Sequence, residues 1–200
     1  NLRHALGVVD IATRTVTEIP VGSFPYTVVV GEKVYVSNWG GRRPGEGDLV
    51  GPAGRGTTVR VDPERYIACE GSVSVVDLDS GEVIKEIQVQ LHSSGLALSP
   101  DGRYLVCANA ASDNLSVIDT AKDEVVETIW ARRSPADLFG ASPNAVCFTP
   151  DGKTLLAANG TQNAVAVIDF KAAKKKSQLR GLIPVGWFPG ALAWDGRLQT

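Results

Sequence analysis

Two stretches of this 200-residue sequence repeat each other and predict an all-β fold, a β-propeller of four-stranded antiparallel blades. Residues 99–120 read SPDGRYLVCANAASDNLSVIDT, and residues 149–170 read TPDGKTLLAANGTQNAVAVIDF. Each contains a Pro-Asp-Gly turn, an apolar strand, a loop with an asparagine and a second strand that ends in Val-Ile-Asp. No window of about ten residues or more has a helical hydrophobic period.

The length of the repeating unit supports four strands in each blade. An aspartate closes a Val-Val-Asp or Val-Ile-Asp strand at positions 10, 77, 119 and 169. The shortest interval is about 42 residues, which four strands of ordinary length and their turns fill. The other two intervals contain insertions. A solenoid or a sandwich would not explain four strands in each period.

The strands follow in order if the first strand of each blade is called A. Val, Ile, Leu and aromatic residues fill these windows, and Gly, Asp, Asn and Pro bound them. The predicted strands are C and D at 5–10 and 15–19; A to D at 26–30, 33–37, 72–77 and 83–89; A to D at 95–98, 104–108, 115–119 and 125–130; A to D at 145–148, 154–158, 164–169 and 178–183; and a last A at 191–194. Residues 1–200 therefore form one partial propeller: 1–22 end a blade, 23–90 form a blade with a long insertion between B and C, 91–130 and 131–186 form two blades, and 187–200 begin another.

The charge and hydropathy of the chain indicate which classes of partner are excluded. A net charge of −2 argues against nucleic acid, and no apolar run approaches the roughly 18 residues that a membrane span needs. The first residues carry neither a start methionine nor a signal-peptide pattern, so a longer protein is expected. Cys107 and Cys147 lie in apolar strands and are expected to be free thiols, while a disulfide from Cys69 to one of them stays open.

The segment Tyr35-Val36-Ser37-Asn38 resembles the Tyr-Val-Thr-Asn signature of the bacterial YVTN-repeat, lactonase-like β-propellers, and Ser-Pro-Asp-Gly and Val-Ile-Asp-Thr resemble the rest of that repeat. Residues 107–109 and 157–159 depart from the signature, and the Gly-His and Trp-Asp signature of the wider WD40-like class is missing. The resemblance implies a ring of about seven blades, of which this chain forms about half. It also implies a periplasmic or secreted location.

Two further stretches resemble a subgroup in which such a propeller precedes an alkaline-phosphatase or phosphoesterase-family domain. They are VYVSNWGGRRP at 34–44 and GLIPVGWFPGALAW at 181–194. The resemblance implies that the partners are the remainder of the propeller and a neighbouring domain or protein.

Propeller geometry predicts a working face. Loops A to B and C to D lie on one face, and loops B to C and D to the next A lie on the other. The Pro-Asp-Gly turns and the lysine run 174–176 fall on the first face and are explained as turns. Both insertions, 40–71 and 131–144, fall on the second, and long loops on a rigid scaffold often carry recognition. The candidate partner-binding residues on that face are Trp39, Arg42, Arg43, Arg55, His92, Arg132, Arg133, Phe139 and Trp187. The alternative is that Trp39 and Trp187 fill blade junctions and that the arginines are merely solvated.

Catalytic patterns are sparse, and no catalytic, cofactor-binding or metal-binding residue is assigned. The two histidines lie far apart in the repeat order, and no Gly-x-Ser-x-Gly or Gly-Lys-Ser/Thr motif occurs. The recurring aspartates at 77, 119 and 169, and the asparagines at 38, 109 and 159, are predicted to bond local turn and backbone groups. The sequence favours a non-catalytic scaffold that binds a partner. The alternatives are a lactonase-like hydrolase with a metal in the central channel, and a surface-layer or adhesion repeat protein.

Overall fold

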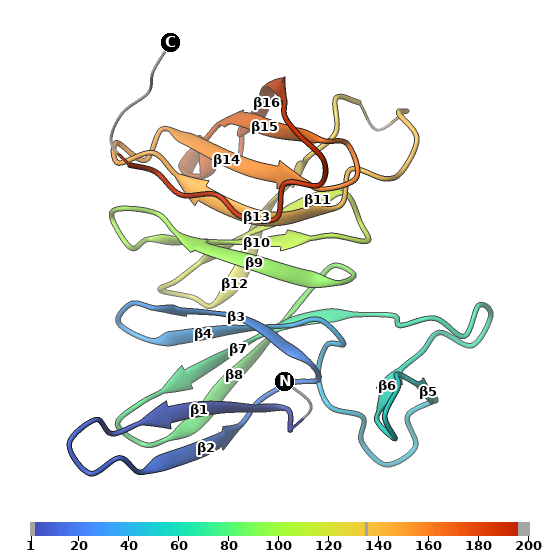
Figure 1. Ribbon diagram of the computed structural model, residues 1–200, viewed down its shortest axis with the longest axis vertical. Helices are drawn as coiled ribbons and strands as arrows, with labels where there is room; N and C mark the ends of the chain where they lie inside the picture. The colour runs from blue at the N-terminus through green and yellow to red at the C-terminus, as the bar shows by residue number, and fades with distance from the viewer. Residues whose placement is uncertain (1–2, 135, 196–200) are drawn as a thin grey trace. The chain divides into compact units, whose positions relative to one another are not determined.

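The computed structural model describes residues 3–134 and 136–195, which fold into antiparallel sheets (Figure 1). The only helix in these residues is one short 3-10 turn, η1 (Ala172–Lys174). The chain divides into two compact units, residues 1–93 and 94–200. Three four-stranded sheets are present, as predicted for propeller blades, so the all-β fold class is confirmed.

The first unit holds a two-stranded sheet, one complete blade and a small hairpin. Its strands are β1 (Ala5–Val9), β2 (Val16–Pro20), β3 (Pro25–Val30), β4 (Val34–Asn38), β5 (Val50–Pro52), β6 (Thr58–Arg60), β7 (Gly71–Asp77) and β8 (Glu82–Val89). The blade has the order β3-β4-β7-β8, while β1 pairs with β2 and β5 with β6. The hairpin β5–β6 lies between the second and third strands of the blade, inside the region predicted as a long loop.

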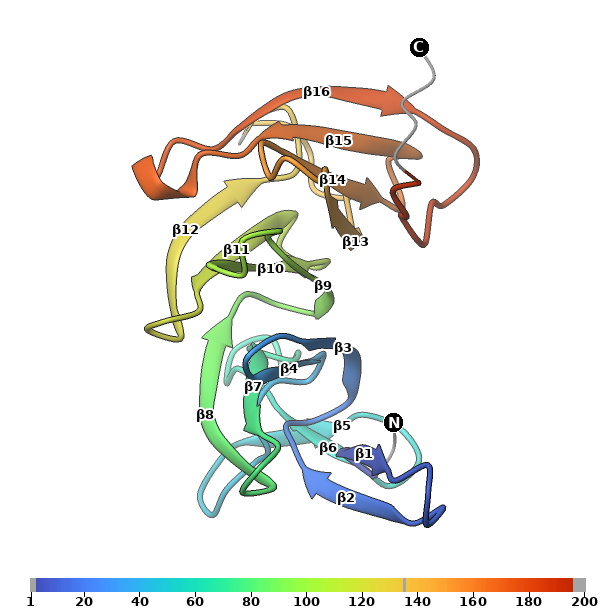
Figure 2. The same cartoon turned by 90° about the vertical axis from the view of Figure 1, so that its left-hand side faces the viewer.

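The second unit holds two complete blades. Their strands are β9 (Ser93–Leu98), β10 (Tyr104–Asn109), β11 (Asn114–Asp119), β12 (Glu124–Trp130), β13 (Pro143–Phe148), β14 (Thr154–Asn159), β15 (Ala164–Asp169) and β16 (Gln178–Pro184). Each blade runs in sequence order, and Figure 2 shows β13 to β16 side by side in their sheet. In each of the three blades the pairing of the third strand with the outer strand shifts register at the same place, opposite Val75/Val76 of β7, Val117/Ile118 of β11 and Val167/Ile168 of β15. A repeated bulge follows from the repeated sequence, and it adds local twist to each blade.

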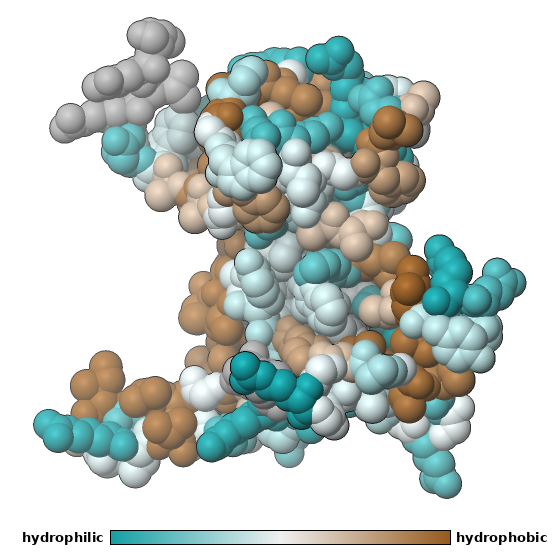
Figure 3. Space-filling model, turned by 45° about the vertical axis from the view of Figure 1, so that its right-hand side comes forward, coloured by the Kyte–Doolittle hydropathy of each residue, from teal (hydrophilic) through white to brown (hydrophobic). Residues whose placement is uncertain are grey.

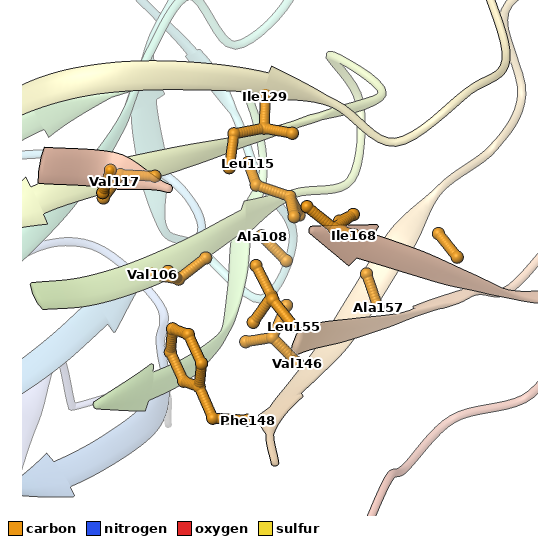
Figure 4. Close-up of a cluster of buried hydrophobic side chains, with 12 residues drawn as sticks. Val106, Ala108, Leu115, Val117, Ile129, Val146, Phe148, Leu155, Ala157 and Ile168 are labelled. Carbon is orange, nitrogen blue, oxygen red and sulfur yellow. The ribbon is translucent and has the colours of Figure 1, made fainter. Parts of the chain in front are cut away.

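The blades pack through apolar side chains. In the second unit, Val106, Leu115 and Ile129 of one sheet meet Leu155 and Ile168 of the other (Figure 4). In the first unit, Ile19 and Val21 belong to a cluster with β4 and Val76 of β7. Each such side chain contributes about 1.5 to 3 kcal/mol when it leaves water, so these contacts are the main source of stability between neighbouring sheets.

Two sequence expectations are corrected. The last A strand at 191–194 is not a strand, because no described strand lies beside it to complete the hydrogen bonds that a strand requires. The B-to-C insertion, expected as a loop, contains the hairpin β5–β6.

The three cysteines are free, which closes the disulfide alternative left open for Cys69. Burial raises the pKa of the Cys107 thiol to about 12, as expected for a cysteine that packs as a small apolar side chain.

The turn aspartates are structural, as predicted, with one exception. The carboxylates of Asp77 and Asp119 accept hydrogen bonds from backbone N–H groups two and three residues later. Asp169 instead forms ion pairs with Arg180 and Lys171, since the connection that follows it is the 3-10 turn rather than a tight turn.

Candidate functional site

The insertion of the first unit is organised around one buried carboxylate. Glu70 is 3% exposed and accepts hydrogen bonds from the backbone N–H of Arg42 at 3.1 Å and from Nη1 of Arg60 at 2.6 Å. Nε of Arg60 forms an ion pair with Asp48 at 3.0 Å. Burial opposes the charge on Arg60, but Glu70 and Asp48 raise its pKa overall. The start, the hairpin and the end of the insertion are thereby tied together.

This insertion presents apolar side chains to solvent. Leu49 and Val50 on one side of the hairpin, and Tyr66 and Ile67 after it, are exposed. Figure 3 shows the insertion as a projecting lobe on which hydrophobic and hydrophilic side chains adjoin. An exposed apolar group on a segment fixed by buried charges has the composition of a recognition surface.

Aromatic rings join the start of the insertion to the two histidines. His4, Phe24, Trp39 and His92 form a chain of edge-to-face contacts, with ring centroids 4.9, 5.7 and 4.5 Å apart. Arg43 donates from Nε to the carbonyl of Val21 at 2.7 Å and from Nη2 to the carbonyl of His4. Trp39 and His92, predicted on one face, are therefore neighbours, while Arg43 is engaged with the preceding sheet.

The environment of both histidines favours the neutral imidazole. Burial, and after it the Arg43 guanidinium, lower the pKa of His4 below its usual 6.5, and burial lowers that of His92. The backbone N–H of Phe24 donates to Nδ1 of His4 at 2.9 Å, so the neutral imidazole carries its proton on Nε2.

The D-to-A loop of the second unit is organised around Arg132. Its guanidinium carbon lies 4.8 Å from the ring centroid of Trp130 and 4.2 Å from that of Phe139, and Nη1 donates to the carbonyl of Asp137. Arg132 is buried, whereas Leu138 and Phe139 are exposed. The loop thus uses the arginine internally and presents the apolar side chains at its tip.

A polar residue just before strand C holds the loop that follows strand D of the same sheet, and the sequence analysis did not identify it. His4, Asp113 and Asn163 each have a positive φ, of 54°, 54° and 52°. Their carbonyls accept from the N–H of Val21, Ala131 and Val185 at 2.9 to 3.0 Å. Their side chains accept from loop N–H groups, those of Phe24 at 2.9 Å, of Gly140 and Ser142 at 2.8 and 3.0 Å, and of Phe188 at 2.9 Å. The signal was present, since each stands six residues before a closing aspartate.

The strand-end asparagines bond differently from the prediction. Asn38 donates to the Ser74 hydroxyl at 2.8 Å and to Glu86 at 3.1 Å, and Asn109 donates to Ser116 at 2.9 Å. Their main partners are side chains of neighbouring strands rather than local backbone groups. Asn159 faces alanines on the next strand and donates instead to the carbonyl of Ala131 at 2.7 Å.

The predicted binding residues thus fall into three groups. Trp39 with His92, and Arg132 with Phe139, are brought together within their units. Arg42 and Arg43 serve internal contacts through Glu70 and two backbone carbonyls. Arg55, Arg133 and Trp187 are exposed. Glu70 itself was missed, although it stands immediately before a Val-Val-Asp strand in an arginine-rich insertion.

Within residues 3–134 and 136–195, no three His, Cys, Asp or Glu side chains gather in a way that could hold a metal ion. In the same part of the chain, no helix has the length and apolarity to cross a membrane.

Two solved structures share this fold. Hydrazine synthase of Kuenenia stuttgartiensis is 29% identical with a TM-score of 0.63, and the match covers 90% of this chain and 43% of that one. Dihydro-heme d1 dehydrogenase NirN, in complex with DHE, is 16% identical with a TM-score of 0.59, and the match covers 91% of this chain and 33% of that one. The chain therefore spans less than half the length of either structure. Comparison with curated proteins gave no match.

A family model described as "Lactonase, 7-bladed beta-propeller" matches residues 65–186. These residues include β7, both blades of the second unit and the repeats from which the propeller was predicted. Since the match spans more than half of the chain, this protein belongs to the seven-bladed β-propeller family of the lactonase type.

Proposed function

We propose that this chain is a non-catalytic propeller segment that recognises a protein partner or a neighbouring domain. Recognition takes place through the insertion 40–71 of the first unit and the loop 131–144 of the second. The observation that carries the proposal is the insertion, which is fixed from within by Glu70 and leaves Tyr66 and Ile67 exposed.

The energetics favour recognition over a passive loop. A solvated connection needs neither a buried charge bridge nor exposed apolar side chains, because polar turn residues suffice. A preorganised surface loses little conformational entropy on binding, so apolar groups such as Leu49, Val50, Tyr66 and Ile67 would contribute more of their burial energy to affinity. Phe139, held over Arg132, and its exposed neighbour Leu138 extend the same design to the second unit.

A photo-activated cross-linker tests the proposal in the protein made by its own host. Placed at Tyr66, it is expected to give one discrete product, identified by mass spectrometry as a partner chain or as another domain of the same protein. Placed at Leu78, which is exposed in the turn between β7 and β8 of the same blade, it serves as the control. The Ile67→Ser change should reduce the product from position 66. Equal products from positions 66 and 78, or no product from either, would contradict the proposal.

We further propose that the neighbouring domain is a metal-dependent phosphoesterase-family domain and that the protein lies outside the cytoplasm. Both rest on the resemblance of 34–44 and 181–194 to propellers of that kind. The open reading frame on both sides of this chain tests the first, and fractionation of the host cell tests the second.

Lactone hydrolysis is a second candidate, favoured by the family match. Purified protein with and without a chelator, offered a panel of lactones, tests it directly. Turnover above the uncatalysed rate would support the enzyme, and its loss with the chelator would support a metal in the channel.

A further inference from the structure

A groove runs between the two blades of the second unit, at the turns that join their first and second strands. It has a volume of about 450 Å³ and is lined by the turn from β9 to β10, the turn from β13 to β14 and the residues that follow β15. A Cβ on Gly152 would lie 3.4 Å from Cδ of Pro100, so the two turns lie against each other. Pockets for small ligands have volumes from about 300 Å³ upward, so this groove has room for a large side chain.

Two aromatic rings form the apolar part of this groove. Tyr104 and Phe170 are half-buried, and their ring centroids lie 5.8 Å apart in an edge-to-face contact. Phe148 of β13 supports Phe170, with ring centroids 4.8 Å apart. The preceding blade has Thr120 at the position of Phe170, since each residue follows the closing aspartate of its third strand. The aromatic ring is therefore an addition to the repeat, and the part of it that remains exposed gives the groove an apolar contact surface.

The connection from β15 to β16, seen with its short 3-10 turn in Figure 2, differs from its counterparts in the other two blades. Residues 170–177 read FKAAKKKS, whereas the counterparts at 78–81 and 120–123 read LDSG and TAKD. The longer connection has four lysines and no acidic residue, while each counterpart has one aspartate and at most one lysine. This connection therefore adds both length and positive charge to the repeat.

Hydrogen bonds hold this connection against the preceding blade. The backbone N–H and the hydroxyl of Ser177 both donate to the carboxylate of Glu127 on β12, each at 2.8 Å. The N–H of Lys171 donates to the Ser177 hydroxyl at 2.9 Å and closes the base of the loop. A loop fixed in this way loses little conformational entropy when it binds a ligand. The connection therefore forms a fixed wall of the groove.

The two Pro-Asp-Gly turns contribute no net charge to the groove. The Asp101 carboxylate accepts hydrogen bonds within its own turn, and the exposed Arg103 in that turn balances its charge. Asp151 and the exposed Lys153 repeat this arrangement in the other turn. The sign of the charge at the groove is therefore set by the connection 170–177.

This connection makes the groove basic. Lys171 is 58% exposed, and its contact with Asp169 is long, at 4.0 Å. Asp169 also forms a shorter ion pair with Arg180 at 3.3 Å, so it neutralises Lys171 only in part. The lysines at 174–176 are exposed in the same connection. An acidic ligand would therefore gain favourable electrostatic energy on this side of the groove.

We propose that this groove binds a short acidic segment of a partner protein through one aromatic side chain. The aromatic side chain lies against Tyr104 and Phe170, and the carboxylates beside it face Lys171 and the lysines at 174–176. Burial of the ring supplies affinity, and the lysines select acidic flanking residues. An anionic membrane fits less well, because Tyr104 and Phe170 line a groove and are half-buried, whereas insertion among lipid headgroups requires an apolar face that the membrane can cover.

Fluorescence anisotropy with labelled peptides tests the proposal on the whole gene-encoded protein. The probe is a short peptide with a central tryptophan flanked by aspartates, and two matched peptides replace the tryptophan by serine or the aspartates by lysines. We expect the tryptophan peptide to bind about tenfold more tightly than the serine peptide, and the lysine peptide not to bind. Equal affinity for the tryptophan and serine peptides, or no binding of the tryptophan peptide, would overturn the proposal. Binding to vesicles that contain phosphatidylserine in place of the peptide would also overturn it.

Variants of the same protein locate the binding. Lys171→Glu should weaken binding of the tryptophan peptide by about fivefold, whereas Lys85→Glu, the same charge change on β8 of the first unit, should leave it unchanged. Phe170→Thr installs the residue of the preceding blade and should remove the preference for tryptophan over serine. Unchanged affinity in Lys171→Glu would refute the proposal, and this variant does not depend on the packing of Phe170. The insertion 40–71 and the loop 131–144 are not involved, so failure here would leave the proposed function intact, and the reverse.

Discussion

Removing the charge of Glu70 should release the insertion from its blade. Glu70→Gln keeps the side-chain shape but leaves the Arg60 guanidinium, which is only 20% exposed, paired with Asp48 alone. Breaking one partner of a buried pair costs about 3 to 5 kcal/mol. The contact with Arg42 adds little, because that side chain is 54% exposed and its charge is screened by water. A local loss of roughly 3 kcal/mol is therefore expected.

Limited proteolysis with trypsin measures this loss. Cleavage after Arg60 requires the β5–β6 pairing to open, so a loss of roughly 3 kcal/mol should raise its rate by about 100-fold when opening is rapid. Cleavage after the exposed Arg55 should change far less. Glu64→Gln, an exposed carboxylate in the same insertion, is the control. Equal cleavage rates after Arg60 in the Glu70→Gln variant and the parent protein would refute the role of Glu70.

Three further predictions concern the loops between strands. The pKa of His4 is lowered in the folded state, so the unfolded chain binds the proton more readily. The free energy of unfolding should therefore fall as the pH drops below about 6.5. Urea titrations at several pH values should show that His4→Asn weakens this dependence. Asp113→Ala leaves two loop N–H groups without their acceptor and should cost about 1 to 3 kcal/mol, seen as faster hydrogen exchange at residues 140–142, whereas Asp113→Asn should retain most of the protection. Gly22→Ala should destabilise the first unit by about 1 to 3 kcal/mol in urea unfolding because of the clash with Asn38, and an unchanged midpoint would show that the loop can move aside.

Several features could be predicted because they depend on neighbours in sequence. The Pro-Asp-Gly turns form as expected, with Gly102 and Gly152 at φ values of 71° and 66° and the Asp101 and Asp151 carboxylates bonded within the turn. The strands of the three complete blades also follow from the sequence, since apolar residues alternate with turn residues over short windows.

Features that depend on distant residues could not be predicted in this way. The bridge from Glu70 to Arg42 joins residues 28 positions apart, and the contact between Trp39 and His92 joins the residue after β4 to a residue that follows β8. Arg43 illustrates the limit most clearly. An arginine in a long loop is typical of a binding surface, but the Arg43 guanidinium donates hydrogen bonds to backbone carbonyls of the preceding sheet.

The sequence by itself determined the fold class, the repeating unit and the places where that unit is interrupted. These are set by local hydrophobic periodicity and turn chemistry, which a single chain displays without its partners. Only the tertiary structure decided which side chains form internal contacts and which remain exposed to solvent. A charged residue has the same identity in both roles, and its role depends on whether a distant group reaches it in the folded protein, as Glu70 reaches the guanidinium groups of Arg42 and Arg60.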